Sequence, residues 1–318
     1  MPRQRSWPGW TKLATSSCAV SHSFPRASVI IRTKDSARTL DRVIALVRAQ
    51  TIPAEIIVVD SGSTDQTLAM ARDEADRVLE IPADRFSFGR ALNLGAAAAR
   101  APIHFALSSH SFPPDNYWIE RSLSKYDRPD VAGTSGAPML PDSQNSLMTT
   151  FYQTLSDAMT HPWWGFSNTG SSWRADVWAR FPFDEELPAC EDKEWGFRVL
   201  AAGWTIAVDP KLSVSEMHRK QHGIRRLYLR TRRESMAIGS FVTLPPITIS
   251  GFLREWLIDL QAHGQYRRWR RRLNYFRLAE LLGKYHGLKA REAMIVPPVR
   301  SEIHGSQFAD TEDTIDPH

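Results

Sequence analysis

Polar side chains stand at the ends of three short apolar runs of the sequence. Thr33 and Asp35 lie at the end of SVIIRTKD, Asp60 ends EIIVVD, and His110 follows IHFALSS. A carboxylate in such a place can accept the imide N–H of uracil or thymine, and the amides of the next turn can face a phosphate. The spacing alone leaves a second interpretation open, in which Asp60 and Ser63 only cap a helix.

The elements that must position these side chains alternate between strand and helix. Apolar runs rich in β-branched residues predict strands at SVIIRT, EIIVVD, RVLEI and IHFAL. SARTLDRVIALVRAQ places four apolar residues on one helical face: Leu40, Val43, Ile44 and Val47. Ser63 or Thr64 can cap the helix after EIIVVD. This alternation predicts an α/β fold with a mainly parallel sheet, helices on both faces, and a site beyond the carboxyl ends of the strands.

Several common classes of site are not indicated. No G-x-G-x-x-G and no G-x-x-x-x-G-K-[ST] occurs, which argues against a dinucleotide site and a P-loop. Cys18 and Cys190 form neither a disulfide framework nor a metal spacing, so we expect a cytoplasmic protein. The longest stretch without charge, 235–253, contains Pro245 and Pro246, which argues against a transmembrane helix.

Four segments, taken in order, resemble one known family. SVIIRTKDSARTL, AEIIVVDSGSTDQTLAMA and FSFGRALNLGAAAARA are similar to the nucleotide-binding half of the family 2 glycosyltransferases, which are inverting enzymes with the GT-A fold. GFSNTGSSWRADVWARFPFDEELPACEDKEWGFRVLAAGW resembles the acceptor and catalytic segment of the same family. The resemblance covers residues 28 to about 220 and is nearest to the rhamnosyltransferase-like branch. It implies transfer of a sugar from a nucleotide-sugar donor.

The resemblance also implies which residues hold the donor. Thr33, Asp35 and Asp60, with Ser61 beside them, would bind the base and ribose. Two residues of FGRALN, Arg90 and Asn93, would line the diphosphate and sugar. A solvated helix residue is the alternative for Arg90.

The acceptor side of the resemblance contains the residues that would perform the chemistry. Inverting transfer needs a carboxylate that takes the proton of the attacking hydroxyl, and the family's Glu-Asp pair matches Glu191 and Asp192. Asp192 is the expected base, and Glu191 would orient the acceptor or a loop. Asn168 would lie near the transferred sugar or the acceptor, with a turn as the alternative. Trp164 could stack on a sugar, although core packing suits this residue as well.

His110 departs from the family pattern. The family generally carries an Asp at this point, which binds Mg²⁺ or Mn²⁺ bridging the phosphates of the donor. Three interpretations remain: His110 ligates the metal, His110 replaces the metal as a hydrogen-bond donor to the diphosphate, or the donor chemistry is lost. His218 could be a second metal ligand, but a surface histidine fits equally. A divalent cation is therefore doubtful, and weak or absent metal dependence is expected.

The remaining segments suggest a domain division and a membrane surface. We expect a loosely ordered leader at 1–26, the GT-A-like domain at 27–220, basic amphipathic helices within 221–298 and a disordered acidic tail at 299–318. The two helices are predicted at about 251–263 and 265–286. Arginines and aromatic residues on them suit an anionic membrane, such as the inner face of a cell membrane. An ordinary solvated helix pair is the alternative.

These expectations combine into one function and two rivals. The sequence predicts inverting transfer of a hexosyl or deoxyhexosyl group from a UDP- or dTDP-sugar to a hydroxyl of a glycan or lipid-linked acceptor. One rival, motivated by His110, is a homologue that binds nucleotide-sugar or membrane without catalysis. The other is a nucleic-acid binder built on the basic helices, which we do not expect because no nucleic-acid-binding motif occurs.

Overall fold

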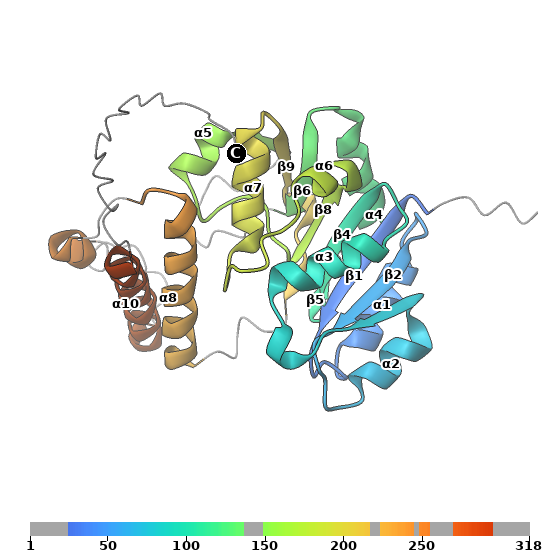
Figure 1. Cartoon of the computed structure of the whole chain (residues 1–318), viewed down its shortest axis with the longest axis horizontal. Coiled ribbons are helices and arrows are strands. Elements are labelled where there is room, and N and C mark those ends of the chain that lie inside the picture. The colour runs from blue at the N-terminus through green and yellow to red at the C-terminus, as the bar shows by residue number, and fades with distance from the viewer. Residues whose placement is uncertain (1–24, 137–148, 217–222, 245–247, 255–269, 295–318) are drawn as a thin grey trace, which may run out of the picture.

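A central sheet organises the chain, which we describe from a computed structural model covering residues 25–136, 149–216, 223–244, 248–254 and 270–294. In these residues the main sheet has eight strands in the order β3-β2-β1-β4-β8-β6-β9-β7 (Figure 1). The first half of the sheet contains β1 (Ala27–Thr33), β2 (Glu55–Asp60), β3 (Arg77–Glu80) and β4 (Ile103–Ser108). The second half contains β6 (Val131–Gly136), β7 (Phe151–Gln153), β8 (Gly170–Arg174) and β9 (Thr205–Asp209). A separate small sheet pairs β5 (Ser111–Phe112) with β10 (Ser215–Glu216).

The predicted mainly parallel sheet is confirmed. β1 pairs in parallel with both β2 and β4, β2 with β3, and β6 with β9. β8 runs antiparallel to its neighbours β4 and β6, and β7 runs antiparallel to β9. The four predicted strands are thus the contiguous parallel half of the sheet, and the antiparallel strands come from the part of the chain after them.

Helices cover both faces because the central strands are apolar on both. On β1, Ile30 belongs to one core cluster, whereas Val29 and Ile31 belong to the other. The Ile30 face is covered by α3 (Phe88–Ala98), α5 (Leu155–Thr160), α6 (Ala175–Arg180) and α7 (Glu191–Ala201). The opposite face is covered by α1 (Leu40–Arg48), α2 (Thr67–Glu74) and α4 (Trp118–Leu123). The four apolar residues predicted to share a face of α1 are all buried.

Short 3-10 turns complete the connections in the described residues. They are η1 (Ala83–Arg85), η2 (Ser124–Asp127) and η3 (Pro210–Leu212).

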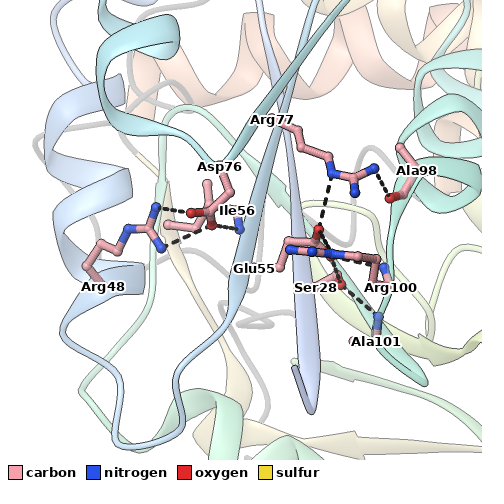
Figure 2. Close-up of polar contacts among 9 residues, drawn as sticks. All are labelled: Ser28, Arg48, Glu55, Ile56, Asp76, Arg77, Ala98, Arg100 and Ala101. Atoms are coloured by element: carbon pink, nitrogen blue, oxygen red, sulfur yellow. Dashed lines mark hydrogen bonds and ion pairs between the residues drawn. The ribbon is translucent and has the colours of Figure 1, made fainter. Parts of the chain in front are cut away.

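A buried carboxylate ties the amino ends of the strands together, at the end of the sheet opposite to the predicted site. Glu55 accepts the Ser28 hydroxyl at 2.6 Å, the Arg100 Nε at 2.8 Å, and lies 3.4 Å from Arg77 Nε (Figure 2). Burial alone would raise the pKa of Glu55, but the hydrogen bonds from Ser28 and Arg100 outweigh it and hold the pKa below its ordinary value. Nearby, Arg48 pairs with Asp76 at 2.9 Å (Figure 2). These contacts are structural.

The C-terminal part differs from the predicted pair of helices. α8 (Ile224–Phe241) was not predicted. α10 (Arg270–Met294) overlaps the predicted 265–286 helix and extends past residue 286, and residues 265–269 lie outside the described residues. Where a helix was predicted at 251–263, the structure shows a helix over 249–254, and residues 255–263 lie outside the described residues. α8 and α10 lie side by side, with α8 next to α7 and both away from α1 and α2 (Figure 1). Within the described residues, no helix combines the length and apolar character needed to cross a membrane.

Glycines allow α8 and α10 to approach closely. A Cβ added at Gly287 would lie 2.3 Å from the Arg232 carbonyl oxygen, and one at Gly283 would lie 2.7 Å from the Tyr228 carbonyl oxygen. Because any larger side chain would push the helices apart, the close contact depends on these two residues. The predicted leader up to residue 24 and the tail at 299–318 lie outside the described residues.

Candidate active site

The three strand ends meet as predicted. Thr33 is the register partner of Asp60, and Ser108 is the partner of Arg32 on the other side of β1. The Ser61 amide donates to the Thr33 carbonyl oxygen at 3.0 Å, which holds the first two strand ends together. The Thr33 hydroxyl is buried and has no hydrogen-bond partner among the described residues. An orphaned hydroxyl at this edge is consistent with a ligand-binding position.

Asp60 organises the turn that follows its strand. Its carboxylate accepts the amide of Gly62 at 3.0 Å and the amide and hydroxyl of Ser63 at 2.9 and 2.5 Å. The predicted cap is wrong: α2 begins at Thr67, and neither Ser63 nor Thr64 caps it, because both are engaged in the turn. Gly62 has a φ of 81°, which the turn requires and which few other residues adopt.

Asp35 joins the first strand end to the same turn. Its Oδ1 atom accepts the Thr64 amide at 2.8 Å, and its own amide donates to the Ser63 hydroxyl at 2.9 Å. Its side chain is exposed, and its φ of 46° is in the left-handed region that Asp tolerates better than most residues. Asp35 therefore presents a carboxylate to solvent from a loop fixed on both sides.

Asn93 does not have the role predicted for it. Its amide nitrogen donates to the Phe183 carbonyl oxygen and to Glu185, and its oxygen accepts from the Trp178 indole and the Phe183 amide, all at 2.9–3.0 Å. An Asn side chain makes four hydrogen bonds at most, so none remains for a donor diphosphate in this arrangement. Asn93 instead fixes the 183–185 loop on α3.

Arg90 contacts the same loop. Its Nε donates to Glu185 at 2.8 Å and its Nη1 to the Arg85 carbonyl oxygen at 2.9 Å. The side chain is 40% exposed, which leaves part of the guanidinium accessible. The hydrogen bonds from Asn93 and Arg90 lower the pKa of Glu185. Arg90 thus combines a contact to the 183–185 loop with a partly exposed charge.

The Glu-Asp pair lies where α7 begins. Asn168 joins its two members: its amide N–H donates to Asp192 Oδ2 at 3.2 Å, and its side-chain nitrogen donates to Glu191 Oε1 at 3.0 Å. Glu191 is buried, whereas Asp192 is half-buried. Cys190, immediately before the helix, has a φ of 62°, a conformation that most residues avoid. The predicted neighbours Asn168, Glu191 and Asp192 are therefore together, and Asp192 keeps access to solvent.

Arg32 completes this cluster and was missed in the sequence. Its Nη2 donates to the Asn168 carbonyl oxygen at 2.6 Å, and its Nη1 lies 3.7 Å from Glu191 Oε1. Its guanidinium lies 5.5 Å from the centre of the Phe88 ring. Its side chain is 13% exposed. A charged residue inside the apolar run SVIIRT was the available signal, because a buried charge requires a partner.

The electrostatics of the cluster distinguish its two carboxylates. Burial, together with the adjacent Asp192 charge, raises the pKa of Glu191 to about 6, and Arg32 acts in the opposite direction. Burial likewise lowers the pKa of Arg32, and Glu191 and Asp192 oppose that effect. Since Glu191 titrates near neutral pH and Arg32 remains charged, the ion pair is complete only above about pH 6.

His110 is the described residue at the position where the family pattern has its metal-binding Asp. His110 is half-buried, and its ring lies 3.1 Å from the Ser108 hydroxyl. In the part of the chain that the structure describes, no three His, Cys, Asp or Glu side chains are placed to hold a metal ion. His218, the second predicted ligand, lies outside the described residues. An imidazole is a poorer ligand than a carboxylate for Mg²⁺, and no step below depends on a metal.

Trp164, the tryptophan predicted near the acceptor, is a packing residue here. Trp164 packs on the core cluster that includes Phe166, with its ring 5.3 Å from that of Phe151. Its neighbour Trp163 lies 5.2 Å from the Lys284 ammonium of α10. Neither contacts the cluster of Arg32, Asn168 and the Glu-Asp pair through a described interaction. Trp163 instead links the α/β domain to the C-terminal helices.

Comparisons with known proteins relate the chain to glycosyltransferases. Residues 28–181 match the model of the family described as Glycosyl transferase family 2. The chain is 37% identical over 83 residues to the succinoglycan biosynthesis protein ExoU of Rhizobium meliloti (strain 1021), a match that covers 26% of this chain and only 22% of that relative.

Solved structures match over more of the chain. The mannosyltransferase PcManGT from Pyrobaculum calidifontis, in complex with GDP-Man and Mn²⁺, has a TM-score of 0.58 and 18% identity, covering 86% of this chain and 77% of its own. The glucosyl-3-phosphoglycerate synthase from Mycobacterium tuberculosis, in complex with Mn²⁺, UDP and glucosyl-3-phosphoglycerate, has a TM-score of 0.52 and 18% identity, covering 76% and 88%. The fold is the GT-A fold of these glycosyltransferases, and residues 28–181 match glycosyl transferase family 2.

Proposed function

We propose that the chain is an inverting glycosyltransferase with Asp192 as its general base. The observation that carries this proposal is the position of Asp192: half-buried, hydrogen-bonded to the Asn168 amide, and next to the buried Glu191. Asp192 Oδ takes the proton of the acceptor hydroxyl while that oxygen attacks the anomeric carbon. The bond from this carbon to the nucleoside diphosphate oxygen breaks, and the diphosphate leaves with the electron pair. Attack opposite the leaving group inverts the anomeric configuration.

The donor is proposed to be a UDP- or dTDP-sugar, held at the ends of β1 and β2. Asp35, Thr33 and Asp60, with Ser61, surround this edge, and Arg90 offers an exposed guanidinium at the start of α3. His110 would donate a hydrogen bond to the diphosphate where the family has a metal-binding Asp. A deoxyhexose such as rhamnose is preferred only on the resemblance to the rhamnosyltransferase-like branch.

The acceptor is proposed to be a growing polysaccharide chain, either free or lipid-linked. The match to a succinoglycan biosynthesis protein supports this class of acceptor. Because that match covers only 22% of the relative, the activity of the whole chain is a proposal. Asn168 would orient the acceptor beside Asp192. We also propose that the basic C-terminal helices approach an anionic membrane on its cytoplasmic side.

A panel of nucleotide-sugars tests this function. UDP-, dTDP- and GDP-sugars are added to the full chain, and both the melting temperature and the release of nucleoside diphosphate are measured. A donor that raises the melting temperature and is hydrolysed supports the proposal. Absence of both for every donor contradicts it.

The rival is a homologue that binds a nucleotide-sugar without turning it over, and the replacement of Asp by His110 is what favours it. In that case a donor raises the melting temperature, but no nucleoside diphosphate is released with any acceptor. The same panel therefore separates the two functions.

A further inference from the structure

A basic cavity lies between the start of α3 and one face of α8. Its volume is about 430 Å³, within the range of small-ligand sites. Phe88 lines it from α3, and Leu227 and Leu229 line it from α8. The rest of its lining is three arginines of α8: Arg226, Arg230 and Arg233. The cavity therefore combines a positively charged wall with apolar surface.

The three arginines form a row along the helix. Their spacing of four and three residues places them on one side of α8, about one helical turn apart. All three are exposed, and Arg230 pairs with Glu234 at 2.6 Å. Among the described residues, the guanidinium groups of Arg226 and Arg233 have no hydrogen-bond or ion-pair partner. Since Glu234 is the single acidic residue in the sequence of α8, against five arginines, this wall has a large excess of positive charge.

The cavity is next to the proposed catalytic cluster. On one wall, the Phe88 ring also contacts the guanidinium of Arg32, which pairs with Glu191. On the other wall, the Glu234 carbonyl oxygen, one residue after Arg233, lies 3.9 Å from the Cys190 sulfur. Cys190 directly precedes the Glu-Asp pair. Both walls therefore lead to the start of α7.

The lining suits a phosphate or diphosphate group. Guanidinium groups bind phosphate oxygens through paired, charge-assisted hydrogen bonds, and a row of them can contact two successive phosphates. A neutral sugar would not require three arginines. The donor edge at β1, β2 and β4 contributes no residue to the lining, so the cavity is separate from the proposed nucleotide position.

We propose that this cavity binds a phosphate or diphosphate group carried by the acceptor, and that the arginines of α8 hold it while the acceptor hydroxyl reaches Asp192. This inference rests on the proposed function and adds the chemical class of the acceptor. The phosphate can be that of a soluble sugar phosphate or that of a lipid-linked sugar. Phe88, Leu227 and Leu229 would contact the apolar part of the acceptor beside the phosphate.

The test compares two pairs of substitutions on the same helix. Arg226→Gln with Arg233→Gln removes two charges from the cavity, and Arg225→Gln with Arg232→Gln removes two exposed charges outside it with the same spacing. Titration calorimetry on the full chain measures binding of three probes: inorganic pyrophosphate, farnesyl diphosphate in phosphatidylcholine vesicles, and UDP. Phosphatidylglycerol vesicles without farnesyl diphosphate control for attraction to an anionic membrane.

We expect Arg226→Gln with Arg233→Gln to weaken binding of pyrophosphate, or of vesicle-borne farnesyl diphosphate, by at least about tenfold. Each lost hydrogen bond to a charged group is typically worth that much. The matched pair should change it less than about twofold, as expected for exposed charges. Tighter binding of the vesicle-borne probe identifies a lipid-linked acceptor, and equal binding identifies the phosphate alone.

Three results would overturn the proposal. The first is that the two variant pairs weaken pyrophosphate binding equally. The second is that Arg226→Gln with Arg233→Gln abolishes UDP binding as well as pyrophosphate binding. The third is that this pair weakens binding to phosphatidylglycerol vesicles as much as binding to farnesyl diphosphate. Release of nucleoside diphosphate from the donor is measured separately. If the wild-type chain releases none but arginine-dependent binding persists, the proposed enzyme fails and the phosphate site remains. If it releases the diphosphate but binding does not depend on these arginines, only the phosphate site fails.

Discussion

Replacing Arg32 with Gln should destabilise the protein at alkaline pH much more than at acidic pH. The folded protein raises the pKa of Glu191 from an ordinary value of 4.5 to about 6. At about 1.4 kcal/mol per pH unit, ionising Glu191 costs the folded state roughly 2 kcal/mol. Because the pKa is raised, the folded protein has these roughly 2 kcal/mol of unfolding free energy below pH 4.5 and loses them as the pH rises through about 6.

Loss of the Arg32 charge, whose Nη1 lies 3.7 Å from Glu191 Oε1, should raise the pKa of Glu191 further. A counter-charge at that range typically changes a carboxyl pKa by about 1–3. At pH 8 the variant should therefore lose about 1.3–2.6 kcal/mol more unfolding free energy, relative to wild type, than at pH 5, since the loss cannot exceed the span from pH 6 to pH 8. At pH 5 Glu191 is largely protonated in both proteins, so this difference disappears.

Urea unfolding at pH 5 and pH 8 measures the effect. Arg26→Gln, an exposed cation just before the other end of β1, is the matched control and should show no pH-dependent difference. Adding Glu191→Gln to Arg32→Gln should abolish the pH dependence, because the titrating group is gone. If Arg32→Gln destabilises equally at both pH values, to within about 0.5 kcal/mol, the ion pair does not control Glu191.

Three further predictions concern other parts of the molecule. Glu55→Gln should cost about 2 kcal/mol at pH 7, because it removes the charge of a buried carboxylate that accepts from Ser28 and pairs with the half-exposed Arg100. The loss should shrink as the pH falls through the lowered pKa of Glu55, and an equal loss at pH 7 and pH 3.5 in urea unfolding would contradict this. Gly287→Ala should force α8 and α10 apart at a cost of about 1–3 kcal/mol, seen as faster amide exchange in both helices, whereas Gly223→Ala, with open space around its Cβ, should not. If His110 is not a metal ligand, EDTA should leave the donor-induced rise in melting temperature unchanged. If EDTA abolishes that rise, donor binding requires a metal ion.

The parallel half of the sheet could be predicted because its signals are local. Ile30, with Val29 and Ile31 on either side, is buried on a strand covered on both faces, and such strands have unbroken apolar runs. The face of α1 and the meeting of Thr33 with Asp60 follow from the same patterns. The polar residues at the strand ends could be predicted because each lies at the last residue of its strand or within two residues of it.

The rest depends on contacts between distant residues. Arg32 meets Asn168, 136 residues away, and Asn93 meets Phe183, 90 residues away, and no local pattern encodes either partner. α8 was missed because its arginines dominate the segment and its apolar face is recognisable only when α10 packs on Gly283 and Gly287.

The rate of sugar transfer by Asp192→Asn tests the central claim most directly. With the donor found in the nucleotide-sugar panel, the substitution should lower turnover by about 100-fold or more while donor binding changes less than about twofold. Glu194→Gln, on the same helix and paired with Arg198, is the control and should retain most activity. A fall in turnover of less than about tenfold for Asp192→Asn would show that Asp192 is not the base.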